Sequence, residues 1–355
     1  MKQKMIICIS ILIVLVLTVI IVLNHPAFGR TPRGERLVRI ERSPNYKEGQ
    51  FVNQEPTPFM TTDKSRWRIM WDNLTEKKPD NLIPSESIHA VKTDLKRLNL
   101  SKDAVVWFGH SSYLLINGGK KILVDPVLTT GFPASLMMKP FKGTDIYSPE
   151  DIPEVDYLII THDHYDHLDY GTVKAIRDKV DKVICPLGVG EHLEYWGYSA
   201  EKIVEMDWNE VYTSEPGFRI TCLTARHFSG RFLRQNPSLW ASFMLEGHST
   251  VYIGGDSGYG AHFSEIGKRF PHIDLAILEN GQYNEEWSLI HLMPQYMAQT
   301  ARDLKAKRVL TVHHSKYALA KHRWDEPLKN AEEMKNKDFL NVLIPEIGEV
   351  VTLEK

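Results

Sequence analysis

Residues 161–167 of this chain read Thr-His-Asp-His-Tyr-Asp-His, and few folds can accept such a run. It follows the apolar run 157–160, which is typical of a buried strand. On an extended segment His162 and His164 point the same way, because alternate side chains share one face of a strand. Imidazole nitrogens and carboxylate oxygens suit Zn²⁺ and related divalent ions. The run therefore predicts a metal site where a strand ends and the chain turns towards a helix.

Other apolar, strand-like runs also end in a potential metal ligand. These ligands are Asp125, His227, Asp256 (in a Gly-rich turn) and His313. Any one of these residues alone is weak evidence for a metal site, because an Asp at a strand end more often forms a turn. Together with 161–167 they make a dinuclear centre plausible. Three His would hold one ion, Asp with two His the other, and a shared carboxylate would bridge.

The chain from about residue 104 consists of short apolar runs broken by Gly, Asp and Pro. Helix-like stretches lie between some of them, at 171–180 and 294–305. This alternation predicts an α/β (α+β) domain, with sheets covered by helices. A formal net charge of −2 gives no reason to expect nucleic acid as the main partner. Cys185 and Cys222 lie in strand-like runs and are expected to be buried apolar residues.

The N-terminal segment is expected to be a membrane anchor, residues 1–28. Residues 5–23 carry no charge and are long enough to cross a bilayer as one helix. Ala27 and Gly29 offer a weak cleavage site, so a removed signal peptide is the alternative. Basic residues flank both sides, which leaves the orientation open. Arginines after the span either meet lipid headgroup phosphates or belong to a solvated linker.

Residues 29–98 are expected to form an N-terminal extension that packs on the main body, residues 99–355. The extension is rich in Pro, Asn, Arg and Lys. Trp67, Met70 and Trp71 at helical spacing predict one short amphipathic helix lying on that body.

The ligands in chain order resemble the five motifs of the metallo-β-lactamase superfamily, over roughly 104–350. The resemblance implies a four-layer αββα sandwich with two zinc ions at one edge of the sheets. It implies one zinc on His162, His164 and His227, the other on Asp166, His167 and His313, Asp256 as the bridge, and Asp125 as the partner of a ligand histidine. Zinc β-lactamases of the common class have Cys where this chain has Asp256, which argues against antibiotic hydrolysis.

A narrower resemblance is to the N-acylphosphatidylethanolamine-hydrolysing phospholipase D branch and its bacterial relatives. This resemblance rests on short sequence motifs at residues 107–112, 226–231, 255–259, 290–294 and 312–314. The branch implies that His291 lies near the substrate phosphate, whereas a capping or surface histidine is the structural alternative. His110 either orients a ligand or packs beneath the site, and His314 is expected to be a bystander.

The expected activity is zinc-dependent hydrolysis of a phosphodiester, such as an N-acylated membrane phospholipid. Two zinc ions would lower the pKa of a shared water and supply a metal-bound hydroxide. Asp166 would orient that water, and a protonated His291 would stabilise the phosphate or donate to the leaving group. A lactone or carboxylic ester hydrolase is the alternative within the superfamily. A noncatalytic metal-binding module tethered to the membrane and a di-iron oxidoreductase are further alternatives.

Overall fold

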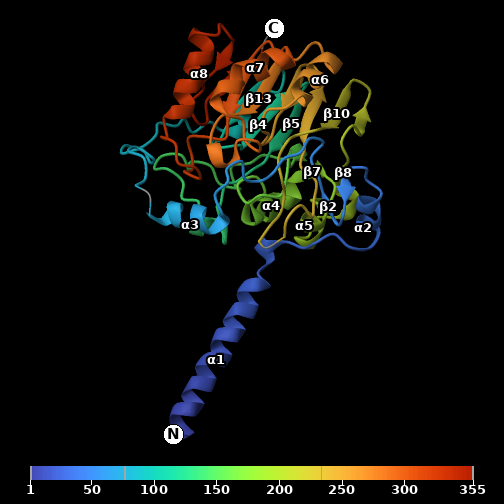
Figure 1. The fold of residues 1–355 in the computed structure, drawn as a ribbon. Helices are drawn as coiled ribbons and strands as arrows, with labels where there is room; N and C mark the ends of the chain where they lie inside the picture. The colour runs from blue at the N-terminus through green and yellow to red at the C-terminus, as the bar shows by residue number, and fades with distance from the viewer. Residues whose placement is uncertain (1, 76, 233, 354–355) are drawn as a thin grey trace.

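Two seven-stranded mixed sheets face each other in the computed structural model, which describes residues 2–75, 77–232 and 234–353 (Figure 1). The first sheet contains, in spatial order, β16 (Val350–Thr352), β3 (Ala104–Trp107), β4 (Tyr113–Asn117), β5 (Lys120–Val124), β6 (Val155–Ile159), β7 (Val180–Pro186) and β8 (Ile203–Met206). The second contains β15 (Val342–Leu343), β14 (Val309–Val312), β13 (Leu275–Glu279), β12 (Thr250–Ile253), β11 (Ser242–Glu246), β10 (Phe218–Leu223) and β9 (Val211–Glu215). Each sheet joins an antiparallel half to a parallel half.

Helices cover the outer face of each sheet. Two lie against the first sheet, α4 (Tyr170–Ile176) and α5 (Gly190–Tyr195). Three lie against the second, α6 (His262–Arg269), α7 (Pro294–Leu304) and α8 (Glu326–Asn336). The order helix, sheet, sheet, helix confirms the predicted four-layer αββα sandwich. The predicted helices at 171–180 and 294–305 correspond to α4, with the short turn that follows it, and to α7.

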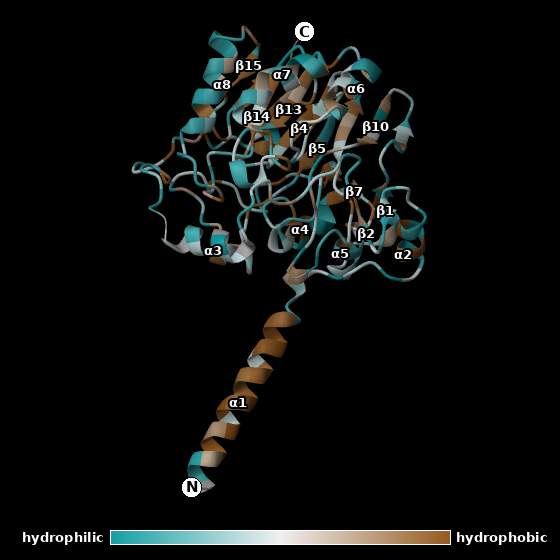
Figure 2. Cartoon of the chain, viewed as in Figure 1, coloured by the Kyte–Doolittle hydropathy of each residue, from teal (hydrophilic) through white to brown (hydrophobic). Residues whose placement is uncertain are grey.

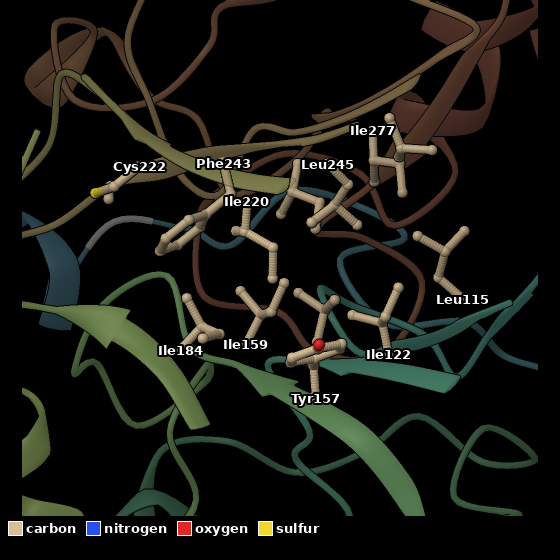
Figure 3. Close-up of a cluster of buried hydrophobic side chains, with 14 of the residues drawn as sticks. Leu115, Ile122, Tyr157, Ile159, Ile184, Ile220, Cys222, Phe243, Leu245 and Ile277 are labelled. Atoms are coloured by element: carbon tan, nitrogen blue, oxygen red, sulfur yellow. The ribbon is translucent and has the colours of Figure 1, made fainter. Parts of the chain in front are cut away.

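The core between the two sheets is apolar. Figure 3 shows side chains of one sheet meeting those of the other, among them Leu115, Ile122, Ile159, Ile220, Phe243 and Leu245. Because successive side chains of a strand point to opposite faces, each strand fills this core with one set and packs on the helices with the other. Cys222 lies in the inter-sheet core and Cys185 lies under the helices, so both are buried as predicted.

Helix α1 (Lys2–Leu23) projects away from the body and has exposed apolar side chains along its length (Figures 1 and 2). At a rise of 1.5 Å per residue its length is about 33 Å, against a hydrocarbon core of about 30 Å. Among the described residues it is the one helix long and apolar enough to cross a membrane. An anchor and a signal sequence both have these properties, and anchoring stays a prediction.

Residues 24–75 and 77–98 lie along the body and form α2 (Gly34–Glu41), β1 (Tyr46–Lys47), β2 (Gln50–Phe51) and α3 (Arg66–Thr75). Ile40 and Phe51 enter the inter-sheet core, so part of the extension belongs to the folded unit. The predicted short helix exists as α3, but Trp67 is 77% exposed and Trp71 is 62% exposed. The expectation that these indoles pack on the body is therefore wrong. The side chain of Met70 lies outside the described part of the structure.

Candidate metal centre

The predicted ligands meet at one edge of the sandwich, because each follows a strand that ends there. The loop 161–167 follows β6, and Asp125 follows the neighbouring parallel strand β5. In the second sheet Asp256 follows β12 and His313 follows β14. The structure thus gathers residues that are more than 180 positions apart in the chain, and all of the ligands predicted from the sequence lie in one buried cluster.

Three imidazoles form the first group of this cluster. Nδ1 of His164 lies 2.9 Å from Nε2 of His162 and 3.3 Å from Nε2 of His227. Two nitrogens bound to one tetrahedral ion at 2.0–2.1 Å are separated by about 3.3 Å. The three nitrogens therefore already have the spacing of ligands that share one ion.

The second group contains Asp166, His167 and His313, with His110 beside them. Oδ2 of Asp166 is 3.7 Å from Nε2 of His167 and 2.9 Å from Nε2 of His110. The rings of His110 and His313 lie 4.1 Å apart between centroids. These potential donors approach within 4.8 Å of one another, which is close enough to surround a second ion.

Asp256 lies between the two groups, with one carboxylate oxygen towards each. Its Oδ2 is 3.7 Å from Nε2 of His227 and 3.9 Å from Nε2 of His162. Its Oδ1 is 3.3 Å from Nε2 of His167 and 3.2 Å from Nδ1 of His313. This is the arrangement that a bridging carboxylate requires, in agreement with the role implied by the sequence motifs.

The chemistry of these donors fits a pair of divalent cations. Nε2 of His167 and Oδ1 of Asp256 are buried without a hydrogen-bond partner among the described residues. Such orphaned polar atoms are costly unless something binds them. Burial lowers the pKa of His162 and His227 far below the usual value, so both imidazoles are neutral, as metal ligands must be.

A shell of hydrogen bonds holds the ligand rings in place. Nδ1 of His167 bonds to Oδ2 of Asp125 at 2.8 Å, and Asp125 also accepts from the Thr161 amide and hydroxyl. Nδ1 of His227 bonds to the Ile290 carbonyl at 2.7 Å. Such partners fix the tautomer and the ring orientation. Asp125 therefore lies where the motif resemblance places it, beside a ligand histidine.

Left-handed backbone occurs at several of these non-glycine positions. The φ angles are 41° at Asp125, 53° at His110 and 67° at His313. Residues other than glycine adopt such angles at a cost of about 1–3 kcal/mol and only where the surroundings impose them. The fold therefore holds these side chains in position at some cost in stability.

His291 lies beside the cluster, neither on the surface nor at a helix cap. Its ring centroid is 5.0 Å from that of His227, and its side chain is 13% exposed. Nδ1 bonds to Oε2 of Glu279 at 2.7 Å, which directs the other ring nitrogen away from Glu279. Although burial opposes it, the carboxylates of Glu279 and Asp256 raise the pKa of His291.

Glu279 is the residue that sequence reasoning missed. It ends β13, is buried, and accepts hydrogen bonds from the Ser257 and Leu292 amides. Burial and the nearby Asp256 raise the pKa of its carboxyl group to about 7. The signal was a carboxylate at the end of the apolar run 275–278, the same signal that identified Asp125.

The structure also defines the positions of His110 and His314, the other two histidines considered in the sequence analysis. His110 bonds to Asp166, so of its two alternatives the structure shows the one in which it orients a candidate ligand. His314 points away from the cluster, and its imidazole bonds to Ser315 and contacts Thr311. Burial lowers the pKa of His314 to about 3.

Comparison with known proteins places this geometry in a family. The sequence profile of the beta-lactamase superfamily domain matches residues 120–314. A Mycobacterium tuberculosis protein is 36% identical over 324 residues, 88% of this chain and 85% of its own length. The N-acyl-phosphatidylethanolamine-hydrolyzing phospholipase D 1 of Caenorhabditis elegans is 27% identical over 269 residues, 68% of this chain and 74% of its own.

A solved structure with the same fold is Igni18, a metallo hydrolase of the archaeon Ignicoccus hospitalis. Its TM-score is 0.57 at 20% identity, and the match covers 72% of this chain and 99% of that one. At this identity the likeness concerns the fold alone. The sequence profile, the two facing sheets and the His and Asp clusters at their edge agree, and the chain belongs to the metallo-β-lactamase superfamily.

Proposed function

We propose that this metal-dependent hydrolase cleaves a phosphodiester, with an N-acylated phospholipid as the substrate class and zinc as the metal. The observation that carries the proposal is His291, held by Glu279 beside a complete set of ligands for two ions. Similarity to a phospholipase D that hydrolyses N-acylphosphatidylethanolamine supports the same substrate class.

The proposed ligands are His162, His164 and His227 for one ion and Asp166, His167 and His313 for the other, with Asp256 shared. Bound there, the ions would acidify a water molecule and offset charge on the phosphate. Although burial and the neighbouring histidines act in opposite directions, the net effect lowers the pKa of Asp166 far below the usual value. Asp166 is therefore an anionic acceptor that can orient a water proton.

His291 is the second proposed catalytic group. Because Glu279 accepts the hydrogen bond of the Nδ1–H group, the opposite nitrogen is the one available to the substrate. A protonated imidazole at this place would stabilise a phosphate oxygen or give its proton to the leaving alkoxide. Glu279 acts only through His291 and is a positioning residue.

Helix α1 favours a lipid over a soluble phosphodiester. Anchored by this helix, the catalytic edge would remain close to a bilayer and its phospholipids. Arg231 donates to the carbonyl of Ala27, just beyond the helix, and to that of Asp163 in loop 161–167, so this loop lies close to the end of the helix.

A substrate screen of the zinc-loaded full-length protein tests the proposal. N-acylphosphatidylethanolamine in mixed micelles, bis-p-nitrophenyl phosphate and a panel of lactones would be compared. We expect hydrolysis of the phospholipid and of the soluble phosphodiester, a strong but measurable reduction of both in His291→Ala, and loss of both in Asp256→Ala. Opening of lactones without turnover of either phosphodiester would overturn the proposal and select the lactonase alternative.

A further inference from the structure

A cavity of about 120 Å³ lies where α1 meets the folded body. Its apolar wall includes Leu23, the last residue of α1, together with Phe28 and Phe232. Its cationic wall consists of Arg30, Arg231 and Arg234. No carboxylate is present among the described residues that line it. An apolar surface beside three guanidinium groups is suited to an amphiphilic anion.

Two of the three arginines that line this cavity, Arg231 and Arg234, form no ion pair with a carboxylate in the described part of the chain. Arg30 pairs with Glu191 at 2.6 Å, but the same carboxylate also pairs with Arg36 at 2.6 Å and lies 3.7 Å from Arg33. Arg36 also pairs with Glu205 at 2.5 Å and with Glu194 at 2.9 Å, so three carboxylates balance Arg30, Arg33 and Arg36. Arg234 is exposed and forms no ion pair within the described part of the chain.

Arg231 adds a charge that is buried and fixed. Its side chain is surrounded by backbone carbonyls, with Nη2 donating to Ala27 at 2.7 Å and Nη1 to Asp163 at 2.6 Å. Thr31 also lines the cavity, and its hydroxyl oxygen is buried without a hydrogen-bond partner among the described residues. The cavity thus offers cationic donors and an unsatisfied hydroxyl to an incoming anion.

The chain that joins α1 to the body is docked rather than loose. Trp196 Nε1 donates to the Pro26 carbonyl at 2.8 Å, and Ala27 is 1% exposed. Gly29 has φ +69°, and a Cβ there would lie 2.0 Å from Nδ1 of His192. Only glycine fits so close to this ring, so the cavity keeps a fixed place at the end of the apolar helix.

We propose that this cavity binds the phosphate of an anionic phospholipid, with Arg30 and Arg234 as donors and the acyl chains running along α1 past Leu23. With α1 across a bilayer, the cavity lies at the depth of the headgroups, where basic residues meet lipid phosphates. The ammonium of phosphatidylcholine or phosphatidylethanolamine would find no carboxylate among the described lining residues, and the nearby Glu191 is buried and already paired with Arg30. The site therefore selects lipids without that cation, such as phosphatidylglycerol. The proposal rests on α1 spanning the membrane and is independent of the reaction at the metal centre.

Native mass spectrometry of the full-length, metal-loaded protein in detergent micelles tests this site. Short-chain phosphatidylglycerol, short-chain phosphatidylcholine and inorganic phosphate would be titrated separately. We expect one phosphatidylglycerol per chain, bound more tightly than phosphatidylcholine, and no retained inorganic phosphate at the same concentration. Arg234→Glu should weaken the phosphatidylglycerol complex at least about tenfold, because it removes a charged hydrogen bond and adds repulsion.

Arg269→Glu is the matched control, since α6 lies on the far side of the body from α1 and the charge change is the same (Figure 1). It should leave lipid binding unchanged. Equal loss in both variants would show general electrostatic attraction and overturn the site, as would unchanged binding in Arg234→Glu. Equal retention of phosphatidylcholine, or retention of inorganic phosphate, would overturn the lipid selectivity. Turnover of bis-p-nitrophenyl phosphate reports on the metal centre separately and should be the same in all three proteins.

Discussion

The inter-sheet core and the metal edge are built from the same strands but follow opposite rules. In the core, both sheets contribute aliphatic and aromatic side chains that pack against one another (Figure 3). A few residues further along those strands, the edge collects buried histidines and carboxylates, orphaned nitrogens and left-handed backbone. The core maintains the fold, whereas the edge uses some of that stability to hold ligands in position.

The contrast explains why such an edge is tolerated at all. Buried polar groups without partners destabilise the folded state, and the net free energy of unfolding of a protein domain is small. The well-packed core provides the stability that offsets this cost. Substitutions in the core should therefore change stability and leave the chemistry intact, while substitutions at the edge should do the reverse.

The largest effect is expected at the bridging position. Asp256→Ala should reduce turnover at least about 10³-fold, equivalent to about 4 kcal/mol of barrier, because Asp256 contacts both groups of ligands. Metal analysis of the purified variant should show fewer than two ions per chain. Asp181→Ala is the control, since Asp181 is exposed at the start of β7, the end of the strand opposite the metal edge. Full activity in Asp256→Ala would remove the bridge from the description of this centre.

In the core, Leu245→Ala should lower the free energy of unfolding by about 4 kcal/mol, because it leaves a cavity between the sheets. Denaturant titration followed by fluorescence measures this loss. Leu136→Ala, at a position 73% exposed, should change stability by less than about 0.5 kcal/mol. Turnover per folded molecule should stay at the wild-type level in both variants, and a selective loss of turnover in Leu245→Ala would contradict the division between core and edge.

A buried lysine near the edge gives a pH-dependent test. Burial lowers the pKa of Lys316 from 10.5 to about 8, and its ammonium donates to the Val127 carbonyl at 3.0 Å. Because the folded-state pKa is the lower one, unfolding takes up a proton between these values, and this group adds stability as the pH rises from about 8 to 10.5.

Relative to Lys316→Met, the wild type should therefore gain on the order of 3 kcal/mol across that pH range. Chemical denaturation of both proteins at several pH values measures the difference. The exposed Lys268→Met should track the wild type throughout. A constant difference between Lys316→Met and the wild type would mean that the buried ammonium carries no such cost.

The smallest effect is expected at the positioning carboxylate. Glu279→Gln keeps the shape of the side chain but removes the charge that orients His291, and turnover should fall about tenfold, or about 1.4 kcal/mol. In a His291→Ala background the same change should have little further effect, since the two residues act as one unit. Independent, multiplicative losses would show that Glu279 acts on the ligands instead.

The ligand set was predictable because each ligand has a sequence signature. A histidine or aspartate that directly follows an apolar strand lies at the edge of a sheet, and His162 and His164 have the spacing of neighbours on one strand face. The order of these ligands along the chain then matched the motif order of a known superfamily, and the four-layer fold was inferred from that match.

Glu279 and Arg231 were not predictable in the same way. A single carboxylate at the end of a strand resembles a turn residue until the Ser257 and Leu292 amides are seen to converge on it. Arg231 lies in a loop of mixed composition, and its burial depends on contacts with Ala27 and Asp163, far away in sequence. Long-range contacts of this kind leave no local pattern. The prediction from amphipathic spacing was wrong for a different reason. Trp67 and Trp71 have helical periodicity, but their side chains are largely exposed instead of packed on the body.

The docked junction after α1 has a consequence for the maturation of the chain. Ala27 is enclosed and its carbonyl is held by Arg231, so a signal peptidase can reach this bond only before the domain folds around it. Cleavage at this bond would therefore have to precede folding, and a chain that folds first would keep its apolar helix.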